Sequence, residues 1–362
     1  MSSLIVEVVK ISDVLPHPNA DRLDLVTVKG WQCIVGRDEY KKGDEVVFIP
    51  PDSILPGPMI EHYKVNYLKN NLGRVGTVKL RGEYSEGLIL PNDGKYRLGT
   101  NVAEFLGITK WEPAPVSTAG KNTHKYDRSR RGVVPENLFR KYTDIENIKN
   151  FPGVLEDGEM VAITEKIHGT NFRFGYVHGG KGLRGWINKL LGKPTFVYGS
   201  RNVQLRLGGS FRKNYYDVNY YEMAVHDYLL NKIPKQFDDF VFYGEIYGPG
   251  IQDLTYGVKR GIMIAFFDIY DIKKGTYLDY FEAFAILEYL DLPAVPLLYC
   301  GTWSREIAER LACGNSKIDE NTLREGVVIR PLVEREKPGF GRVILKMISQ
   351  EYLTRKKGTE NH

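Results

Sequence analysis

Short apolar runs separated by Gly, Pro, Asn and Asp recur along the N-terminal third of the chain. They cover residues 4–11, 23–28, 32–35, 45–49 and 75–80. Many of their side chains are β-branched, which is typical of strands. Because no long helical period interrupts them, the pattern predicts a small β-barrel. Residues 101–106 predict a short helix with Asn101 as its N-cap.

After residue 135 the pattern is mixed. Apolar strand-like runs occupy residues 160–164, 240–242, 262–265 and 324–330. Helical periods occupy residues 135–141, 220–231, 280–289 and 304–313. Several strands interspersed with a few helices predict an α+β fold.

Charged residues stand at the ends of several of these runs. Lys166 closes the run at 160–164, and Glu325 lies near the start of the run at 324–330. A lysine at the end of a buried strand can be partly desolvated, which lowers its pKa and frees its amine as a nucleophile. Further charged residues on or beside short strands are Arg201, Glu245, Asp268 and Lys346. Strand ends that line one cleft could form a site for phosphate transfer.

The ordered set of these motifs resembles the covalent nucleotidyltransferase superfamily, and within it the ATP-dependent RNA ligases of the RNA ligase 2 type. Residues 165–172 (EKIHGTNF) are similar to that family's nucleophile motif almost letter for letter. DNA ligases and capping enzymes usually carry Asp where this chain has His168, which favours an RNA ligase. The resemblance covers residues 135–353.

This resemblance implies a role for each matching residue. Lys166 would attack the α-phosphate of ATP and hold AMP, which would pass to an RNA 5′-phosphate before a 3′-hydroxyl displaces it. The other implied roles are adenine binding for Glu165 and Phe267, ribose binding for Glu245, orientation of phosphates and nick ends for Asn171 and Arg201, α-phosphate contact for Lys346, and Mg²⁺ or Mn²⁺ binding for Glu325 and Asp268.

The chain departs from the family at its last motif, which often holds two lysines separated by one residue. Lys346 stands alone, with Ile344 and Ile348 at that spacing on either side. The missing charge is therefore supplied elsewhere or is dispensable.

Residues 17–23 (HPNADRL) resemble the opening of OB-fold RNA-binding modules, including tRNA-binding domains of some synthetases. Such barrels often bind single strands, so this module would grip the substrate; the alternative is a rigid accessory domain. An N-terminal OB fold before an RNA ligase 2-type core resembles a branch of ligases that seal nicks with an RNA 3′-hydroxyl end.

The predicted organisation is an OB-fold domain at 1–111, a basic linker at 112–135 and a nucleotidyltransferase domain of antiparallel sheets flanked by helices at 136–362. The linker is either solvated or a basic strap that orders on nucleic acid. Residues 181–193 read as a surface insertion or a nucleic-acid contact. Tyr215, Tyr216, Tyr220 and Tyr221 suit either base stacking or helix packing.

Composition changes this picture little. The chain has 362 residues, a formal net charge of +5 and a pI near 8.8, which fits nucleic acid as a partner. Three isolated cysteines indicate a reducing compartment, the cytoplasm or nucleus. The sequence shows no secretory signal and no apolar run long enough to span a bilayer.

Competing sites fit the sequence less well. The Gly- and Lys-rich stretches at 179–182 and 192–194 lack P-loop spacing, with Pro194 at the hydroxyl position. His168 has no second His or Cys at ligand spacing, so we expect a structural hydrogen-bonding role rather than a zinc site. On a strand, Phe266 and Phe267 face opposite sides, so one belongs to the core. Asp268 could instead cap a turn.

We therefore expect a monomeric ATP-dependent RNA ligase that acts on nicked RNA duplexes or RNA–DNA hybrids. One alternative is another covalent nucleotidyltransferase, a DNA ligase or a capping-type enzyme, which nucleotide preference would distinguish. The other is a non-catalytic RNA-binding protein on a ligase-like core, against which the retained charged residues argue.

Overall fold

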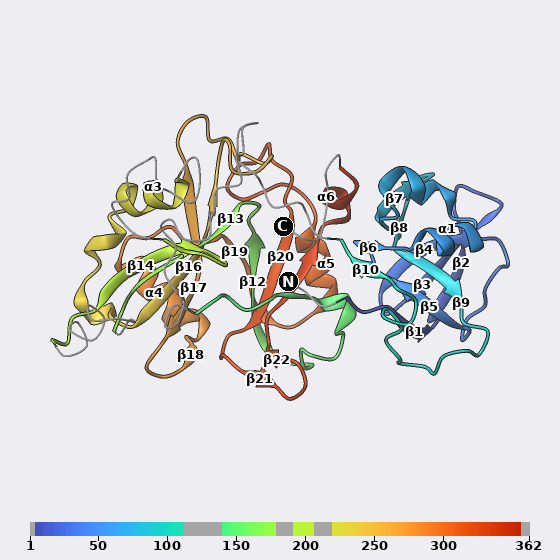
Figure 1. The fold of residues 1–362 in the computed structure, drawn as a ribbon, viewed down its shortest axis with the longest axis horizontal. Helices are drawn as coiled ribbons and strands as arrows, with labels where there is room; N and C mark the ends of the chain where they lie inside the picture. The colour runs from blue at the N-terminus through green and yellow to red at the C-terminus, as the bar shows by residue number, and fades with distance from the viewer. Residues whose placement is uncertain (1–3, 112–139, 179–190, 206–218, 356–362) are drawn as a thin grey trace. The chain divides into compact units, whose positions relative to one another are not determined.

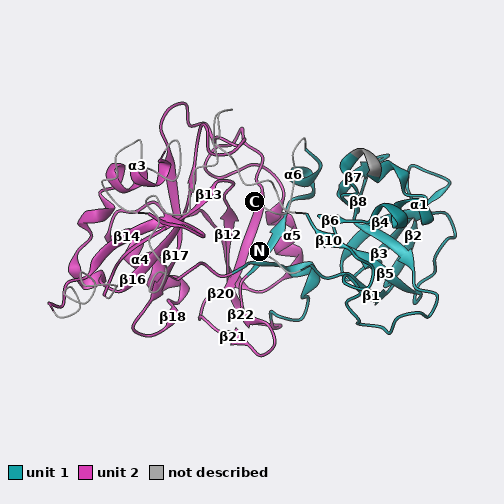
Figure 2. Ribbon diagram, viewed as in Figure 1, with its two compact units in different colours: residues 1–113, 144–155, 345–362 teal, residues 114–143, 156–344 magenta. Residues whose placement is uncertain are grey.

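The computed structural model describes residues 4–111, 140–178, 191–205 and 219–355 (Figure 1). The chain divides into two compact units (Figure 2). The first comprises residues 1–113, 144–155 and 345–362, and the second comprises residues 114–143 and 156–344. The units are thus discontinuous in sequence, whereas the predicted domains were continuous segments.

The first unit is built from short antiparallel strands. One sheet has the order β1 (Glu7–Lys10), β5 (Glu45–Ile49), β9 (Leu88–Pro91), and another has the order β2 (Asp13–Pro16), β3 (Leu23–Val28), β4 (Trp31–Gly36). The remaining pairs are β6 (Ser53–Ile54) with β10 (Thr109–Lys110) and β7 (Thr77–Leu80) with β8 (Glu83–Glu86). Short helices are α1 (Gly57–His62) and the 3₁₀ turn η1 (Asn66–Asn71).

Strand β5 lies at the centre of this unit's core. Alternation along the strand sends Val46 and Phe48 into one apolar cluster and Val47 and Ile49 into another. Burial on both faces explains why residues 46–49 of this strand are continuously apolar.

One element predicted for this unit is wrong. Residues 101–106 form turns rather than a helix, and Asn101 pairs with Glu7 in an isolated bridge. The Asn101 side-chain oxygen accepts hydrogen bonds from the N–H groups of Val6 and Ala103. A tertiary contact with the N-terminal strand region therefore uses the group that was expected to cap a helix.

Two segments from later in the chain complete the first unit. Strand β11 (Glu146–Asn147) pairs in parallel with β23 (Leu345–Ile348), and η3 (Ile148–Asn150) and α6 (Gln350–Thr354) follow them. Lys149 is buried, and its Nζ lies 2.7 Å from both carboxylate oxygens of Glu86. This ion pair fastens residues 144–155 to the N-terminal barrel strands.

The second unit contains an antiparallel six-stranded sheet. Its order is β15 (Gln204–Leu205), β14 (Thr195–Ser200), β13 (Thr170–Val177), β16 (Phe240–Tyr247), β17 (Met263–Asp271), β18 (Thr276–Tyr277). In the same unit, β12 (Met160–Lys166) lies between β19 (Leu297–Thr302) and β20 (Gly326–Pro331), antiparallel to both. A small hairpin joins β21 (Glu336–Lys337) to β22 (Gly341–Arg342).

Helices accompany both sheets of this unit (Figure 1). They are α3 (Tyr220–Asp227), α4 (Tyr280–Tyr289) and α5 (Arg305–Ala312), with 3₁₀ turns η5 (Leu230–Lys232) and η6 (Lys235–Phe237). Helices α3 and α4 share the core of the six-stranded sheet, whereas α5 packs beside β20. Side chains of Asn219 and Ser304 cap α3 and α5. The predicted helices at 220–231, 280–289 and 304–313 are present, and the α+β class is confirmed. Tyr221 packs in the core, which favours helix packing over base stacking for this residue.

Other predictions lie wholly or largely outside the described residues. They concern the linker at 112–135, the helix at 135–141, the insertion at 181–193, the glycine-rich stretch at 179–182, and Tyr215 and Tyr216. No helix in the part of the chain that the structure describes is long and apolar enough to cross a membrane.

Candidate active site

Lys166 and Glu325 meet at the ends of two neighbouring strands. The antiparallel register of β12 and β20 places Lys166 opposite Gly326, so Glu325 comes just before the shared end. The Lys166 Nζ donates to Glu325 Oε1 across 2.5 Å. The carboxylate is fully buried, whereas the lysine side chain is 20% exposed. The predicted nucleophile is therefore held by a buried anion and still reaches solvent.

His168 contacts the same carboxylate from the other side. Its Nδ1 lies 3.4 Å from Glu325 Oε2, and its Nε2 lies 2.7 Å from the carboxylate of Asp253. The His168 backbone N–H donates to the Tyr256 hydroxyl across 2.7 Å. The imidazole is buried, and its contacts match the hydrogen-bonding role expected from the sequence.

Three further predicted residues gather at one end of the six-stranded sheet. Asn171 on β13 pairs in register with Glu245 on β16. On the other side of β13, Phe172 pairs with Ser200, so Arg201 follows at the same end of the sheet. Strand pairing thus brings together residues that lie far apart in sequence.

Close backbone packing requires glycine beside this group. A Cβ on Gly169 would lie 2.2 Å from the carbonyl oxygen of Ile246 on β16. A Cβ on Gly199 would lie 1.9 Å from the Val203 oxygen, inside the turn that presents Arg201. Side chains at either position would displace a strand end that carries a site residue.

The charged groups of the site influence one another. Burial raises the pKa of Glu245 to about 8; Glu325 adds to this rise, whereas Lys166 and Arg201 oppose it. Burial lowers the pKa of Arg201, and the nearby Glu245 opposes that shift. Glu245 therefore lies within electrostatic reach of the other three, and much of it is protonated at neutral pH.

Glu165 offers a hydrogen-bond acceptor. Its Oε2 accepts from the backbone N–H of Lys317 across 2.7 Å, and the Nε of Arg324 lies 3.7 Å away. Its other oxygen, Oε1, is buried and has no hydrogen-bond partner among the described residues. A buried carboxylate oxygen without a donor is costly, so this position suits a ligand that brings one.

Phe266 and Phe267 divide between the core and the site, as expected. Phe266 is fully buried, and Phe267 is partly exposed and packs against the apolar cluster that contains Ile167. The register shifts here: Tyr243 pairs with Asp268 and Gly244 with Phe266, which leaves Phe267 as an extra residue in β17. Such a bulge re-aims a side chain and is frequent beside active sites.

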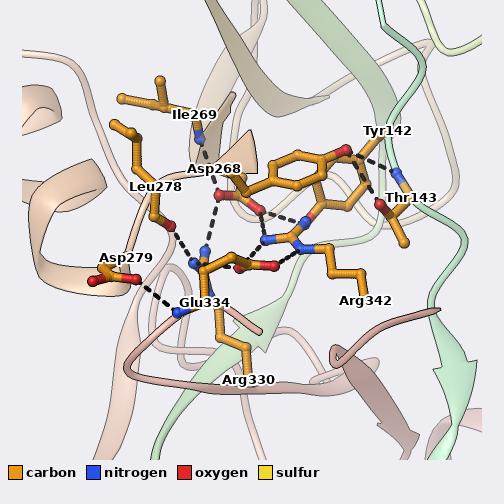
Figure 3. A network of polar contacts seen from close by, with 10 residues as sticks. Tyr142, Thr143, Asp268, Ile269, Leu278, Asp279, Arg330, Glu334 and Arg342 are labelled. Carbon is orange, nitrogen blue, oxygen red and sulfur yellow. Dashed lines mark hydrogen bonds and ion pairs between the residues drawn. The ribbon is translucent and has the colours of Figure 1, made fainter. Parts of the chain in front are cut away.

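Asp268 lies within a network of arginine side chains (Figure 3). Its Oδ1 accepts from Arg330 Nη1 and its Oδ2 from Arg342 Nη2, at 2.9 and 2.6 Å. The Tyr142 hydroxyl also donates to Oδ2, across 2.9 Å. Burial alone would raise the pKa of Asp268, but the two arginines hold it below its usual value. Two guanidinium cations already neutralise this carboxylate, so we reassign Asp268 from metal binding to structure.

Lys346 belongs to the first unit, on β23, and is buried. Ile344 and Ile348, at the spacing of the family's second lysine, are both buried apolar residues. Neither position therefore supplies the missing charge. The contact of Lys346 with a nucleotide phosphate stays a prediction.

Comparisons with known proteins place this geometry in a family. A family model described as RNA ligase matches residues 159–348, and an OB-fold domain model matches residues 5–92. No curated protein matches the chain.

Similar solved structures are RNA ligases from Naegleria gruberi. A variant with ATP and Mn is 24% identical, with a TM-score of 0.75 over 98% of this chain and 100% of that one. A variant with AMP and Mn is 25% identical, with a TM-score of 0.73 over 98% and 99%. The enzyme with PPi is 25% identical, with a TM-score of 0.72 over 97% and 98%.

Both resemblances seen in the sequence are thereby confirmed: the ligase core and the N-terminal OB fold. The ligase model covers more than half of the chain, from just before β12 to the end of β23. On this evidence the chain belongs to the RNA ligase family.

Proposed function

We propose that this RNA ligase uses ATP to join an RNA 3′-hydroxyl end to a 5′-phosphate end through a Lys166–AMP intermediate. The observation that carries the proposal is the Lys166 amine, which is solvent-accessible and held 2.5 Å from the buried Glu325 carboxylate. A fixed anion orients the amine, and a positioned nucleophile is the main requirement of covalent catalysis.

In the first step the deprotonated Nζ of Lys166 attacks the α-phosphorus of ATP. The N–P bond forms, the bond from that phosphorus to the bridging oxygen breaks, and pyrophosphate leaves. An oxygen of the RNA 5′-phosphate then takes AMP from Lys166. Finally the 3′-oxygen attacks that 5′-phosphorus and AMP leaves. Each step is a displacement at phosphorus, which positioned cations such as Arg201 favour.

The free Oε1 of Glu165 supports ATP rather than GTP as the nucleotide. Adenine presents an exocyclic amino group that can donate to a carboxylate oxygen, whereas guanine presents a carbonyl oxygen at that position. In this proposal Phe267 stacks on the base, and Glu245 binds the ribose hydroxyls. A capping-type enzyme that uses GTP fits this acceptor poorly.

A divalent cation, Mg²⁺ or Mn²⁺, would neutralise phosphate charge during each displacement. Among the described residues, no group of three or more His, Cys, Asp or Glu side chains is arranged to hold a metal ion. Mg²⁺ typically needs only one or two carboxylates, with waters and substrate phosphates as its other ligands. Glu325 is the carboxylate that fits this role, while Asp268 is neutralised by arginines.

The substrate we favour is a nick in duplex RNA or in an RNA–DNA hybrid, which makes RNA repair in the cytoplasm or nucleus the biological role. An OB fold commonly binds nucleic-acid strands, and the chain has a formal net charge of +5. A DNA ligase or a non-catalytic RNA-binding protein is the competing interpretation.

The first test is incubation with α-labelled ATP or GTP and Mg²⁺ or Mn²⁺, without nucleic acid, followed by denaturing electrophoresis. We expect a labelled band with ATP that disappears in Lys166→Ala. It should persist in Lys232→Ala, which removes an exposed lysine of the same unit. Label that survives in Lys166→Ala would refute the nucleophile assignment, and label from GTP alone would favour a capping-type enzyme.

A second assay separates the remaining alternatives. The labelled protein is given nicked RNA duplex, RNA–DNA hybrid or nicked DNA, and joined products are measured. Joining that requires an RNA 3′-hydroxyl end supports the proposal. Equal sealing of all-DNA nicks would favour a DNA ligase, and a protein that binds RNA without ever taking label would be the non-catalytic form.

A further inference from the structure

Residues 140–143 lack helix or strand structure, yet side chains of the six-stranded sheet hold them firmly. We call them the docked segment. The Tyr243 hydroxyl donates to the Arg140 carbonyl oxygen across 2.8 Å, and Arg140 Nη1 donates to the Tyr270 hydroxyl across 2.9 Å. At the other end, the N–H of Thr143 donates to the Tyr277 hydroxyl across 3.2 Å.

These three tyrosines come from β16, β17 and β18, more than a hundred residues further along the chain. The docked segment is therefore bound to the sheet by hydrogen bonds from tyrosine hydroxyls rather than by backbone pairing with a strand. Each hydroxyl satisfies a polar group that would otherwise lose its water when the segment docks.

Tyr142 lies in the middle of the docked segment and makes two separate contacts. Its hydroxyl donates to the Asp268 carboxylate, inside the arginine network (Figure 3). Its ring, which is buried, meets the ring of Phe267 edge to face, with centroids 4.9 Å apart and an interplanar angle of 69°. The rings of Tyr243 and Tyr277 lie 5.0 and 5.6 Å away and enclose it.

The contact with Tyr142 helps to fix the orientation of the Phe267 ring. As the extra residue of the bulge, it has no partner in the β16 ladder to fix its direction. Its ring packs against the apolar cluster that contains Ile167, the residue after the nucleophile, and against the ring of Tyr142. Edge-to-face pairing constrains both the position and the tilt of an aromatic ring.

We infer that Tyr142 is a positioning residue for nucleotide binding, because it holds Phe267 in the orientation that receives the adenine ring. This inference rests on the proposed stacking role of Phe267. It assigns to the docked segment a share in nucleotide affinity, although no residue of that segment belongs to the sequence motifs of the site.

The two contacts of Tyr142 can be separated by substitution. Tyr142→Phe removes the hydroxyl and keeps the ring against Phe267. Tyr142→Leu removes the ring as well. Tyr270→Phe is the matched control, because it deletes an anchor of the same segment at Arg140.

ATP binding is measured at equilibrium by calorimetry in the full-length Lys166→Ala protein, which cannot form the covalent intermediate. We expect Tyr142→Leu to weaken ATP binding by about two- to tenfold, the range for one aromatic pair. Tyr142→Phe keeps the ring, so it should lower the melting temperature and weaken ATP binding less than Tyr142→Leu does. Tyr270→Phe should lower the melting temperature and leave ATP affinity unchanged. If Tyr142→Leu does not fold, Tyr142→Met replaces the ring with a flexible apolar side chain in the same assay.

Phe267→Leu and the double variant complete the cycle. If Tyr142 acts through Phe267, Tyr142→Leu weakens binding no further once Phe267 is gone. An equal additional loss in the double variant, or unchanged ATP affinity in a folded Tyr142→Leu protein, would overturn the inference. Should Phe267→Leu itself bind ATP normally, the stacking role fails instead, and the labelling of Lys166 still tests the ligase function separately.

Discussion

Single residues of the nucleophile motif are fixed by steric fit as well as by chemistry. Gly169 follows the buried His168, and its backbone passes against Ile246 of β16. The same strand carries Glu245 one residue earlier. The motif glycine therefore lets the chain turn from β12 into β13 without displacing β16.

We predict that Gly169→Ala damages both stability and AMP attachment. The new methyl group would lie 2.2 Å from a backbone oxygen that cannot rotate aside. Overpacking of this kind costs about 1–3 kcal/mol. Denaturant unfolding and ATP labelling measure the two effects.

Gly153→Ala is the control, since a Cβ there meets nothing within 4 Å. It should leave both quantities near wild type. If Gly169→Ala behaves like Gly153→Ala, steric fit is not the reason for glycine in this motif.

At this scale the sequence predicted much of the site. Lys166, Glu325 and Glu245 lie next to apolar runs that were visible in the sequence. Pairing of β12 with β20 brings Lys166 to Glu325, and the charges of both act on Glu245. The arginine partners of Asp268, Arg330 and Arg342, could not be foreseen because they lie far away in sequence and no local pattern points to them. Tyr142 was missed for the same reason.

At the scale of elements, buried charge joins strands that share no hydrogen-bonded ladder. Asp268 on β17 binds Arg330 on β20 and Arg342 on β22. Glu334 accepts from both arginines, at 3.2 and 2.7 Å. All four side chains are at most 10% exposed, so removal of one charge leaves the others uncompensated.

We predict that Asp268→Asn lowers the free energy of unfolding by about 3–5 kcal/mol, because two buried guanidinium groups lose one of the two anions that they share. Denaturant unfolding checks this. Glu309→Gln, which breaks the exposed pair with Arg305 in α5, should cost less than about 1 kcal/mol. A stable Asp268→Asn protein that loses metal-dependent adenylation would restore Asp268 as a metal ligand.

Elements with strong local signals were predictable. Helix α4 matches its predicted bounds, and β3 and β5 match the runs at 23–28 and 45–49. Strands β2 and β8 were not foreseen because they are short and include acidic residues, so only their ladder partners make them strands. The bulge at Phe267 likewise depends on the neighbouring strand.

At the scale of the whole molecule, the two units contain different segments of the chain from the predicted domains. Residues 144–155 and 345–362 belong with the N-terminal barrel. These segments are attached to the barrel by contacts such as the ion pair between Lys149 and Glu86, which are 63 residues apart. No sequence pattern predicts such a contact. Deleting residues 1–105 would therefore remove the partners of these segments as well as the OB fold, so it cannot isolate the role of the OB fold in end joining.

The contribution of charge to RNA binding can be measured on the full-length protein by varying the salt concentration. With a net charge of +5, the protein should hold RNA largely through phosphate contacts, each of which releases counterions. We predict that apparent RNA affinity in the joining assay falls steeply as KCl rises from about 50 to 200 mM. AMP attachment, which involves no RNA, should change much less. Equal salt sensitivity of both steps would contradict an electrostatic grip on RNA.

We expect the basic linker between residues 112 and 135 to contribute part of this electrostatic binding of RNA. One variant replaces its cationic side chains by glutamine, at Lys121, Lys125, Arg128, Arg130 and Arg131. The control neutralises the same number of exposed lysines in the second unit, at Lys232, Lys235, Lys259, Lys273 and Lys274. If the linker contacts phosphates, the salt slope of RNA binding falls by up to about 0.7–0.9 per contact in the first variant and little in the control. Equal slopes in the two variants would instead mean that the linker is a solvated tether and that the grip on RNA lies in the folded units.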